Sequence, residues 1–316
     1  KLRKIFQMNL IINATKPFNF DATIRSHGWF LMAPYRWSTT NKNLSRTDIL
    51  KSGKIITYQI SNHSSDCEES LISITTNNNL NQEEAGEIIS NVKKILRINE
   101  DLSEFYKICN KKGGHWKGLI NGKGRLLCSP TFFEDFVKTI CTTNTNWKRT
   151  ITMVKNIVSN YGEYDGNQNA TFPKPDLIAS LLPNEIAETC GLGYRAKYIV
   201  AFSNKYVKNP SYYEKLVSNV SSPEELFNKL IEIKGVGPYS AGTLMMLLGN
   251  YSRLAVDSEM LSFVKKKYSN GKNLTKDDIN EIYEGWGIWK YLAYWFDEPV
   301  EKKQDINNYE GIHLLF

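Results

Sequence analysis

The sequence predicts an α+β fold in which an antiparallel β-sheet domain comes first and an all-helical domain follows. Short runs rich in β-branched and aromatic residues alternate with polar turns up to about residue 77. Beyond residue 81, apolar residues recur mostly at helical spacing. Strands and helices do not alternate along the chain, which argues against a parallel sheet. We therefore expect a sheet domain at residues 1–80 and a helical domain at residues 81–316.

In the first domain, four runs are typical of strands, namely residues 18–24, 28–37, 54–60 and 70–76. The polar stretches 38–48 and 61–70 between them indicate turns. A run of three asparagines, Asn77 to Asn79, marks the expected boundary. The alternation of short strands and turns is what predicts an antiparallel sheet.

In the second domain, helices are expected over residues 81–98 and 101–109, and two more within 131–162, separated by the polar residues 142–146. The glycine- and lysine-rich stretch 110–125 is most simply a solvated loop, and alternatively a loop that faces phosphate. One further helix, rich in tryptophan and tyrosine, is expected over residues 281–298. Its aromatic stripe is typical of core packing, above all at Trp286 and Trp289.

The most informative stretch is a predicted pair of helices at residues 222–249, joined by a tight glycine turn. Ser222 can cap the first helix, Pro223 suits its first position and Glu225 can complete a capping box. The turn reads Lys234, Gly235, Val236 and Gly237, and Pro238 can open the second helix. Such a turn points backbone N–H groups at one place and so predicts an anion site, although a plain connecting turn has the same pattern.

About twenty residues past the glycine turn, an apolar run ends at Asp257 and another helix begins. Taken alone, Asp257 is most simply the N-cap of that helix. A carboxylate at this spacing from the turn is also the candidate for a catalytic residue. Both interpretations remain open at this point.

Composition favours a folded soluble protein with an acidic partner, because the formal charge is +7 and the pI is about 8.9. Five cysteines occur singly with no CxxC pair, which argues against a metal centre, an iron–sulfur cluster or a disulfide framework. No apolar run reaches membrane-spanning length, and the first residues lack a full signal-peptide pattern. The chain begins at Lys1, so an expected intracellular location leaves a removed targeting segment open.

Together, the glycine hairpin, the spacing and the Val256-Asp257 pair resemble the helix-hairpin-helix DNA glycosylase superfamily. The segments CTTNTNWKRT at 141–150 and GLGYRAKY at 191–198 resemble its 8-oxoguanine branch. The resemblance implies that Asn144 fills the hole left by a flipped nucleotide and that Tyr194 is an intercalating wedge. It also implies that Arg149 and Arg195 contact the base opposite the lesion.

The resemblance further implies that Asp257 is catalytic, that the turn at 234–237 binds phosphate and that Gly28 lines the base pocket through its backbone. In bifunctional members, the position two residues after the second hairpin glycine is a lysine that forms a Schiff base. Here that position is Tyr239, which is similar to the alkylpurine branch. An alignment of the C-terminal aromatic helix adds Tyr294 and Trp295 to the pocket.

We therefore expect a DNA N-glycosylase of base excision repair that flips out and hydrolyses a damaged purine, without lyase activity. The resemblance implies double-stranded DNA as partner, a monomeric enzyme, no metal or organic cofactor, and a place in a prokaryotic cytoplasm or a eukaryotic nucleus. Two alternatives remain, a glycosylase/lyase that uses another lysine such as Lys234, and a DNA-binding protein without catalysis.

Overall fold

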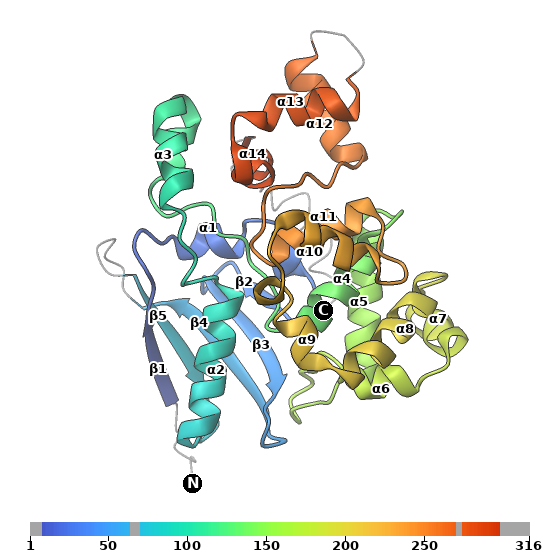
Figure 1. The fold of residues 1–316 in the computed structure, drawn as a ribbon. Helices are drawn as coiled ribbons and strands as arrows, with labels where there is room; N and C mark the ends of the chain where they lie inside the picture. Colours follow the sequence, from blue (N-terminus) through green and yellow to red (C-terminus); the bar gives the residue numbers. More distant parts are fainter. Residues whose placement is uncertain (1–7, 64–69, 270–273, 298–316) are drawn as a thin grey trace. The chain divides into compact units, whose positions relative to one another are not determined.

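The computed structural model describes residues 8–63, 70–269 and 274–297, which divide into two compact units (Figure 1). The first unit comprises residues 1–102 and 118–210, and the second comprises residues 103–117 and 211–316. The first holds the sheet and the second holds the glycine hairpin. The expected boundary at residue 80 falls between the last strand and the helix after it, and as a domain boundary it stays a prediction. Cys67 lies outside the described residues.

The sheet of the first unit has five antiparallel strands in the order β1-β5-β4-β3-β2. They are β1 (Met8–Asn13), β2 (Arg36–Ser38), β3 (Asn43–Ile49), β4 (Ile55–Asn62) and β5 (Leu71–Thr76). Helix α2 (Gln82–Ile95) lies along the sheet (Figure 1). The predicted α+β class is confirmed, as are the strands expected at 54–60 and 70–76.

Two of the four predicted strands are wrong. Residues 18–24 contain the helix α1 (Phe20–Ile24), which begins because the Asn19 side chain accepts a hydrogen bond from the Ala22 N–H at 2.9 Å. The run 28–37 forms a 3-10 helix, η1 (Gly28–Leu31), and only its end joins the sheet as β2. Bulky apolar residues here signal burial, and burial alone does not distinguish a strand from a short helix.

The stretch 38–48, expected to be a turn, contains the strand β3. The polar side chains of this stretch suggested an exposed turn, but Arg46 and Asp48 are buried in spite of their charge. Arg46 donates to Asp48 at 2.6 Å and to both carboxylate oxygens of Glu134, at 3.0 and 2.7 Å. Lys138, also fully buried, pairs with Glu134 at 2.7 Å. This buried ion cluster, Arg46, Asp48, Glu134 and Lys138, connects the sheet to helix α4 (Phe132–Thr142).

Helices complete the first unit. They are α4 (Phe132–Thr142), α5 (Trp147–Tyr161), α6 (Pro175–Ser180), α7 (Pro183–Cys190) and α8 (Arg195–Lys208). The two helices expected within 131–162 are confirmed, and α2 has the full capping box formed by Asn81 and Glu84. Rings of Phe136 and Phe202 stack at 3.8 Å between α4 and α8 and form part of the core.

The second unit contains helices and connecting loops, and no strand among its described residues. It contains α3 (Ser103–Lys112), α9 (Pro210–Glu214), η3 (Val217–Asn219), α10 (Pro223–Ile231), α11 (Pro238–Leu247), α12 (Ser258–Tyr268), α13 (Lys276–Glu284), η4 (Gly287–Trp289) and α14 (Lys290–Asp297). The expected loop at 110–125 includes a 3-10 helix, η2 (Gly114–Leu119). The single helix predicted at 281–298 is broken. Helix α13 ends at Glu284 with Gly285 as its C-cap, and Gly287, which has a positive φ of 55°, begins η4. Residue 298 lies outside the described residues.

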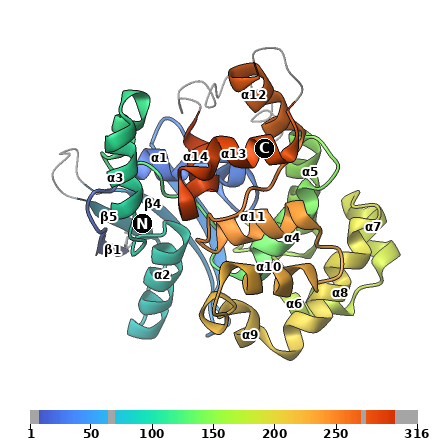
Figure 2. The same cartoon turned by 45° about the horizontal axis from the view of Figure 1, so that its top comes forward.

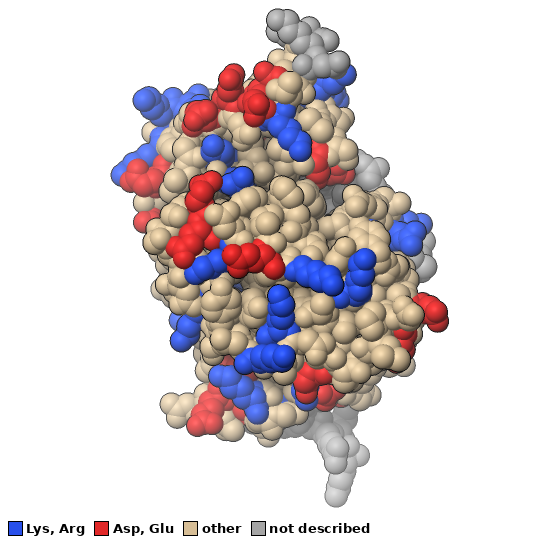
Figure 3. Space-filling model, turned by 45° about the vertical axis from the view of Figure 1, so that its right-hand side comes forward, with Lys and Arg blue, Asp and Glu red and all other residues tan. Residues whose placement is uncertain are grey.

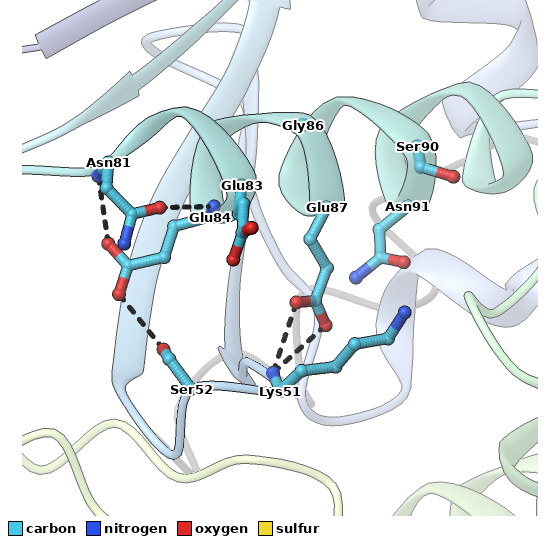
Figure 4. Close-up of a pocket in the computed structure, with 9 residues that line it drawn as sticks. All are labelled: Lys51, Ser52, Asn81, Glu83, Glu84, Gly86, Glu87, Ser90 and Asn91. Atoms are coloured by element: carbon cyan, nitrogen blue, oxygen red, sulfur yellow. Dashed lines mark hydrogen bonds between the residues drawn. The ribbon is translucent and has the colours of Figure 1, made fainter.

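A polar hollow of about 680 Å³ lies on the surface of the first unit, between α2 and the turn at Lys51 and Ser52 (Figure 4). The Lys51 N–H donates to the Glu87 carboxylate at 3.1 Å, and the Ser52 hydroxyl donates to Glu84 at 2.9 Å. Two of the three acidic side chains that line the hollow, Glu84 and Glu87, thus accept hydrogen bonds from protein donors, and none of the predicted site residues lines it. The helices of the described residues are all too short or too polar to cross a membrane.

Candidate active site

The hairpin forms from the two helices that the sequence predicts, α10 and α11, which pack side by side (Figure 2). The Ser222 side chain accepts a hydrogen bond from the Glu225 N–H at 3.1 Å, as expected for an N-cap. The Glu225 carboxylate does not close the expected capping box. It accepts instead from the N–H and the hydroxyl of Ser221, both at 2.7 Å. The cap therefore reaches one residue further back than the motif predicts.

The turn between these helices exposes backbone donors. Gly235 has a φ of +96°, a conformation that glycine adopts without strain. The Val236 side chain is buried and its N–H donates to the Ile233 carbonyl at 2.9 Å, which fixes the turn. Within the described part of the chain, the N–H groups of Gly235 and Gly237 have no acceptor, and no side chain caps α11. These donors, at the positive end of a helix, are available to an anion.

Asp257 lies at the N-terminus of α12, where its Oδ1 accepts a hydrogen bond from the Met260 N–H at 2.8 Å. It is thus an N-cap, as the simpler interpretation of the sequence predicted. Its side chain is half-buried, and among the described residues no donor occupies Oδ2. The preceding loop packs tightly on α11, because a Cβ built on Gly242 would stand 3.0 Å from the Ala255 Cβ. The capping role and a free carboxylate oxygen therefore coexist at one residue.

Aromatic side chains from α11 and α14 gather around Tyr291, and Asp257 is near enough to act electrostatically on that tyrosine. Tyr239 is half-buried at the start of α11, and Tyr291 and Tyr294 are buried with ring centroids 6.1 Å apart. Trp295 lies 5.8 Å from Tyr294 and its indole N–H points at the Met246 sulfur, 2.6 Å away. The structure thus brings together Tyr239, Tyr294, Trp295 and Asp257, all within the second unit.

Tyr291 and Thr243 also belong to this cluster, and neither was among the site residues predicted from the sequence. Burial raises the pKa of Tyr291 well above its usual value, and the neighbouring Tyr239, Tyr294 and Asp257 raise it further, whereas a hydrogen bond with Thr243 lowers it. The Tyr291 phenol therefore stays protonated and can donate. Thr243, whose hydroxyl also reaches the Tyr239 carbonyl at 3.1 Å, sits one helical turn after Tyr239. The i, i+4 spacing from Tyr239 was the available signal for Thr243, and the aromatic stripe was the signal for Tyr291.

The first unit brings together a second group, Thr143, Asn144, Tyr194 and Arg195. Asn144 and Tyr194 are exposed, and the Asn144 Nδ2 donates to the Tyr194 hydroxyl at 3.1 Å. Burial raises the pKa of Tyr194, but hydrogen bonds with Thr143 and Asn144 and the charge of Arg195 bring it below its usual value. Arg195 is only 5% exposed. The predicted insertion residues are therefore neighbours, although 50 positions apart in sequence.

Arg149 and Gly28 also belong to the first unit. Arg149 is exposed on the first turn of α5, where its N–H donates to the capping Asn146 side chain at 2.9 Å. Gly28 lies directly against Trp147, because a Cβ at residue 28 would stand 2.0 Å from the indole ring. A glycine is thus required there by packing, and its predicted backbone contact with a base stays a prediction.

The positive net charge does not form one uniform basic face in the view of Figure 3, where Lys and Arg stand among Asp and Glu. Lys234 is exposed on the hairpin turn. Local donors such as the hairpin amides must therefore supply part of any affinity for a polyanion.

The chain matches known proteins of DNA base excision repair. Residues 137–287 match the family described as HhH-GPD superfamily base excision DNA repair protein. The DNA-3-methyladenine glycosylase of Bacillus subtilis is 24% identical over 222 residues, which cover 66% of this chain and 71% of that protein. These matches confirm the predicted resemblance.

Solved structures show the same fold. The 3-methyladenine DNA-glycosylase from Archaeoglobus fulgidus superposes with a TM-score of 0.72 at 20% identity, over 90% of this chain and 96% of that chain. The Clostridium acetobutylicum 8-oxoguanine glycosylase/lyase, bound to double-stranded DNA with cytosine opposite 8-oxoguanine, gives 0.67 at 20% identity over 93% and 98%. The fold is thus shared by both branches that the sequence resembles.

Proposed function

We propose that this chain, which matches the HhH-GPD family and a DNA-3-methyladenine glycosylase, is a DNA N-glycosylase of the base excision repair type. We further propose that it removes a damaged purine by hydrolysis alone. The observation that carries the proposal is Tyr239. This residue occupies the position at which bifunctional members of the superfamily have the Schiff-base lysine, and it stands in an aromatic cluster beside Asp257. A phenol cannot form an imine, so the expected product is an intact abasic site.

In the proposed reaction, Asp257 acts as an ionised carboxylate. The N-terminus of α12 is a favourable place for a negative charge, and the bond from Met260 holds the side chain in one orientation. The free Oδ2 is available to stabilise positive charge that develops on the sugar as the glycosidic bond breaks, and to orient or deprotonate the attacking water. Tyr239 and Tyr294 supply flat surfaces on which a flipped base can stack.

Double-stranded DNA is the proposed partner, which is supported by the DNA-bound glycosylase/lyase that shares the fold. The hairpin amides are assigned to a phosphate, Asn144 to the hole left by the flipped nucleotide, and Tyr194 to the wedge. Arg149 is assigned to the base opposite the lesion, since it is exposed and can make bidentate contacts. The expected association with DNA in a cytoplasm or nucleus and the expected monomer remain predictions.

One observation favours a second candidate, a DNA-binding protein without catalysis. Asp257 caps α12, so a carboxylate at this position has a structural purpose even in a chain that excises nothing. The two functions differ in whether an abasic site forms.

The experiment that tests the proposal is a screen of the purified chain against duplex oligonucleotides that contain 8-oxoguanine, alkylated adenine, hypoxanthine or uracil. Hot alkali then cleaves any abasic site. We expect strand cleavage with at least one purine lesion, and only after alkali. Binding to lesion duplexes without cleavage by alkali would favour the non-catalytic candidate.

A second prediction concerns the lyase step. Imine formation requires an uncharged amine at the sugar, and a lysine in water is protonated at neutral pH. Lys234 is exposed on the turn, and the one buried lysine among the described residues, Lys138, is paired with Glu134. Borohydride added during turnover should therefore trap no covalent protein–DNA adduct. An adduct in good yield, lost on replacement of a single lysine, would show that the bifunctional alternative is correct.

A third prediction concerns the hairpin. Gly237 has an ordinary negative φ of −96°, and a Cβ there would meet nothing within 4 Å. Gly237→Ala should therefore fold as well as the parent chain yet crowd a phosphate, and weaken binding to every duplex by about 1–2 kcal/mol. Fluorescence anisotropy with several duplex sequences measures the loss. Gly86→Ala, at an open position on α2, is the control and should bind normally. Unchanged affinity in Gly237→Ala would remove the hairpin from the DNA interface.

A further inference from the structure

Arg195 lies at a position that is unfavourable for a positive charge for two reasons. It is the first residue of α8, and a positive charge at the N-terminus of a helix is unfavourable. It is also buried, and a buried cation is costly unless hydrogen bonds replace its water. The residue that the sequence suggests for a base contact therefore does not lie at the surface. Its position must be explained by what it contacts inside the protein.

Those contacts are backbone carbonyls. The Arg195 Nη1 donates to the Leu192 carbonyl at 3.2 Å, and Nη2 donates to the carbonyls of Thr143 and Asn144, the latter at 3.3 Å. Thr143 is the C-cap of α4, and the C-terminal end of a helix carries partial negative charge. The unfavourable position of the Arg195 charge at the N-terminus of α8 is thus offset by its favourable contact with the C-terminal end of α4. One side chain connects the two segments that hold Asn144 and Tyr194.

The hydrogen bonds from Arg195 support an unusual backbone conformation at Asn144. Asn144 has a φ of +46°, in the left-handed region that asparagine tolerates better than most residues. In this conformation its amide meets the Tyr194 hydroxyl, which the Thr143 hydroxyl also approaches at 3.3 Å. The guanidinium itself lies 4.8 Å from the centre of the Tyr194 ring. The exposed pair Asn144 and Tyr194 is therefore held together by contacts within the protein, and Arg195 supports both residues.

We propose that Arg195 is a positioning residue, which holds Asn144 and Tyr194 in the conformation that fills a duplex where a base is missing. The inference rests on the proposed function, since it takes Asn144 as the plug and Tyr194 as the wedge. The Arg195 side chain is only 5% exposed and both its terminal nitrogens donate to backbone carbonyls, whereas its buried Nε has no partner among the described residues. We therefore assign the reading of the opposite base to the exposed Arg149. The ligand recognised by Asn144 and Tyr194 is a DNA duplex in which one base is missing, whichever base lies opposite the gap.

The test compares binding to a duplex with a tetrahydrofuran abasic analogue against the intact duplex of the same sequence, with each of the four bases opposite. The variants are Arg195→Ala, Asn144→Ala, the double variant and Arg149→Ala. We expect Arg195→Ala to reduce the preference for the abasic duplex about tenfold, as for the loss of hydrogen bonds to a charged group, and equally for all four opposite bases. Arg149→Ala should instead change the ranking of the four bases.

The double variant separates positioning from a general loss of structure. If Arg195 acts through Asn144, the double variant should lose little more than either single variant. Additive losses, or a ranking of opposite bases altered by Arg195→Ala as strongly as by Arg149→Ala, would overturn the inference. Should Arg195→Ala fail to fold, Arg195→Lys keeps the charge but lacks the planar fork, and the same cycle with Asn144→Ala applies. Failure of the proposed function is seen in the lesion screen with the parent chain, whereas failure here is seen only in the variants.

Discussion

Replacing Asp257 with asparagine should abolish most excision and leave the fold intact. The asparagine Oδ1 can still accept the hydrogen bond from the Met260 N–H, so the cap of α12 is preserved. The negative charge beside the sugar is lost, and with it the acid–base and electrostatic contribution, so single-turnover excision should fall by about 10²–10⁴-fold. The measurement is the rate of alkali-labile strand formation on the preferred lesion duplex.

Two controls separate catalysis from structure in this experiment. Asp277→Asn removes one exposed carboxylate from the first turn of α13 in the same unit, and its excision rate should match that of the parent chain. Asp257→Ala also removes the cap, and should lower the stability by a further amount of about 1 kcal/mol. If Asp257→Asn kept full activity, or lost it only by unfolding, the carboxylate would be no more than a cap.

Glu134→Gln should cause a large loss of stability, although the residue lies outside the active site. Glu134 is the acceptor for both Arg46 and Lys138, and all three side chains are buried. The substitution leaves Arg46 with Asp48 but leaves Lys138 without its carboxylate. Breaking a buried pair in this way costs about 3–5 kcal/mol. Urea unfolding at pH 7 measures it.

The matched control is Glu104→Gln, which breaks the pair with Lys107 between side chains that are 65% and 72% exposed. An exposed pair contributes at most about 1 kcal/mol, so little change is expected. An equally small cost for Glu134→Gln would mean that the buried ion cluster does not hold the sheet to α4.

The loss of unfolding free energy caused by Glu134→Gln should also depend on pH. Burial by itself raises the pKa of Glu134, but the charges of Arg46 and Lys138 and their hydrogen bonds lower it to about 2. A carboxyl whose pKa is lowered in the folded state stabilises that state above its ordinary pKa of about 4.5 and loses the contribution as the pH falls towards 2. The difference in unfolding free energy between the parent chain and Glu134→Gln should therefore narrow below pH 4.5.

Much of the candidate site could be predicted from the sequence because its signals are local. The caps of the hairpin helices, the glycine turn and the position of Asp257 depend on residues within a few positions of one another. The same holds for the polar residues that separate α4 from α5. Short-range backbone preferences and hydrogen bonds determine such features, and they are visible in any sequence that contains them.

The tertiary structure alone decided the features that depend on partners distant in sequence. Strand β3 carries Arg46 and Asp48 into the interior because Glu134, 88 positions away, accepts the hydrogen bonds of the arginine. In the same way, Arg195 is buried because the carbonyls at the end of α4, more than 50 positions away, replace its water. A charged side chain in a sequence predicts exposure, since burial without partners is costly. Only the fold supplies the partners, and so only the fold distinguishes a charge that reads DNA from one that holds the protein together.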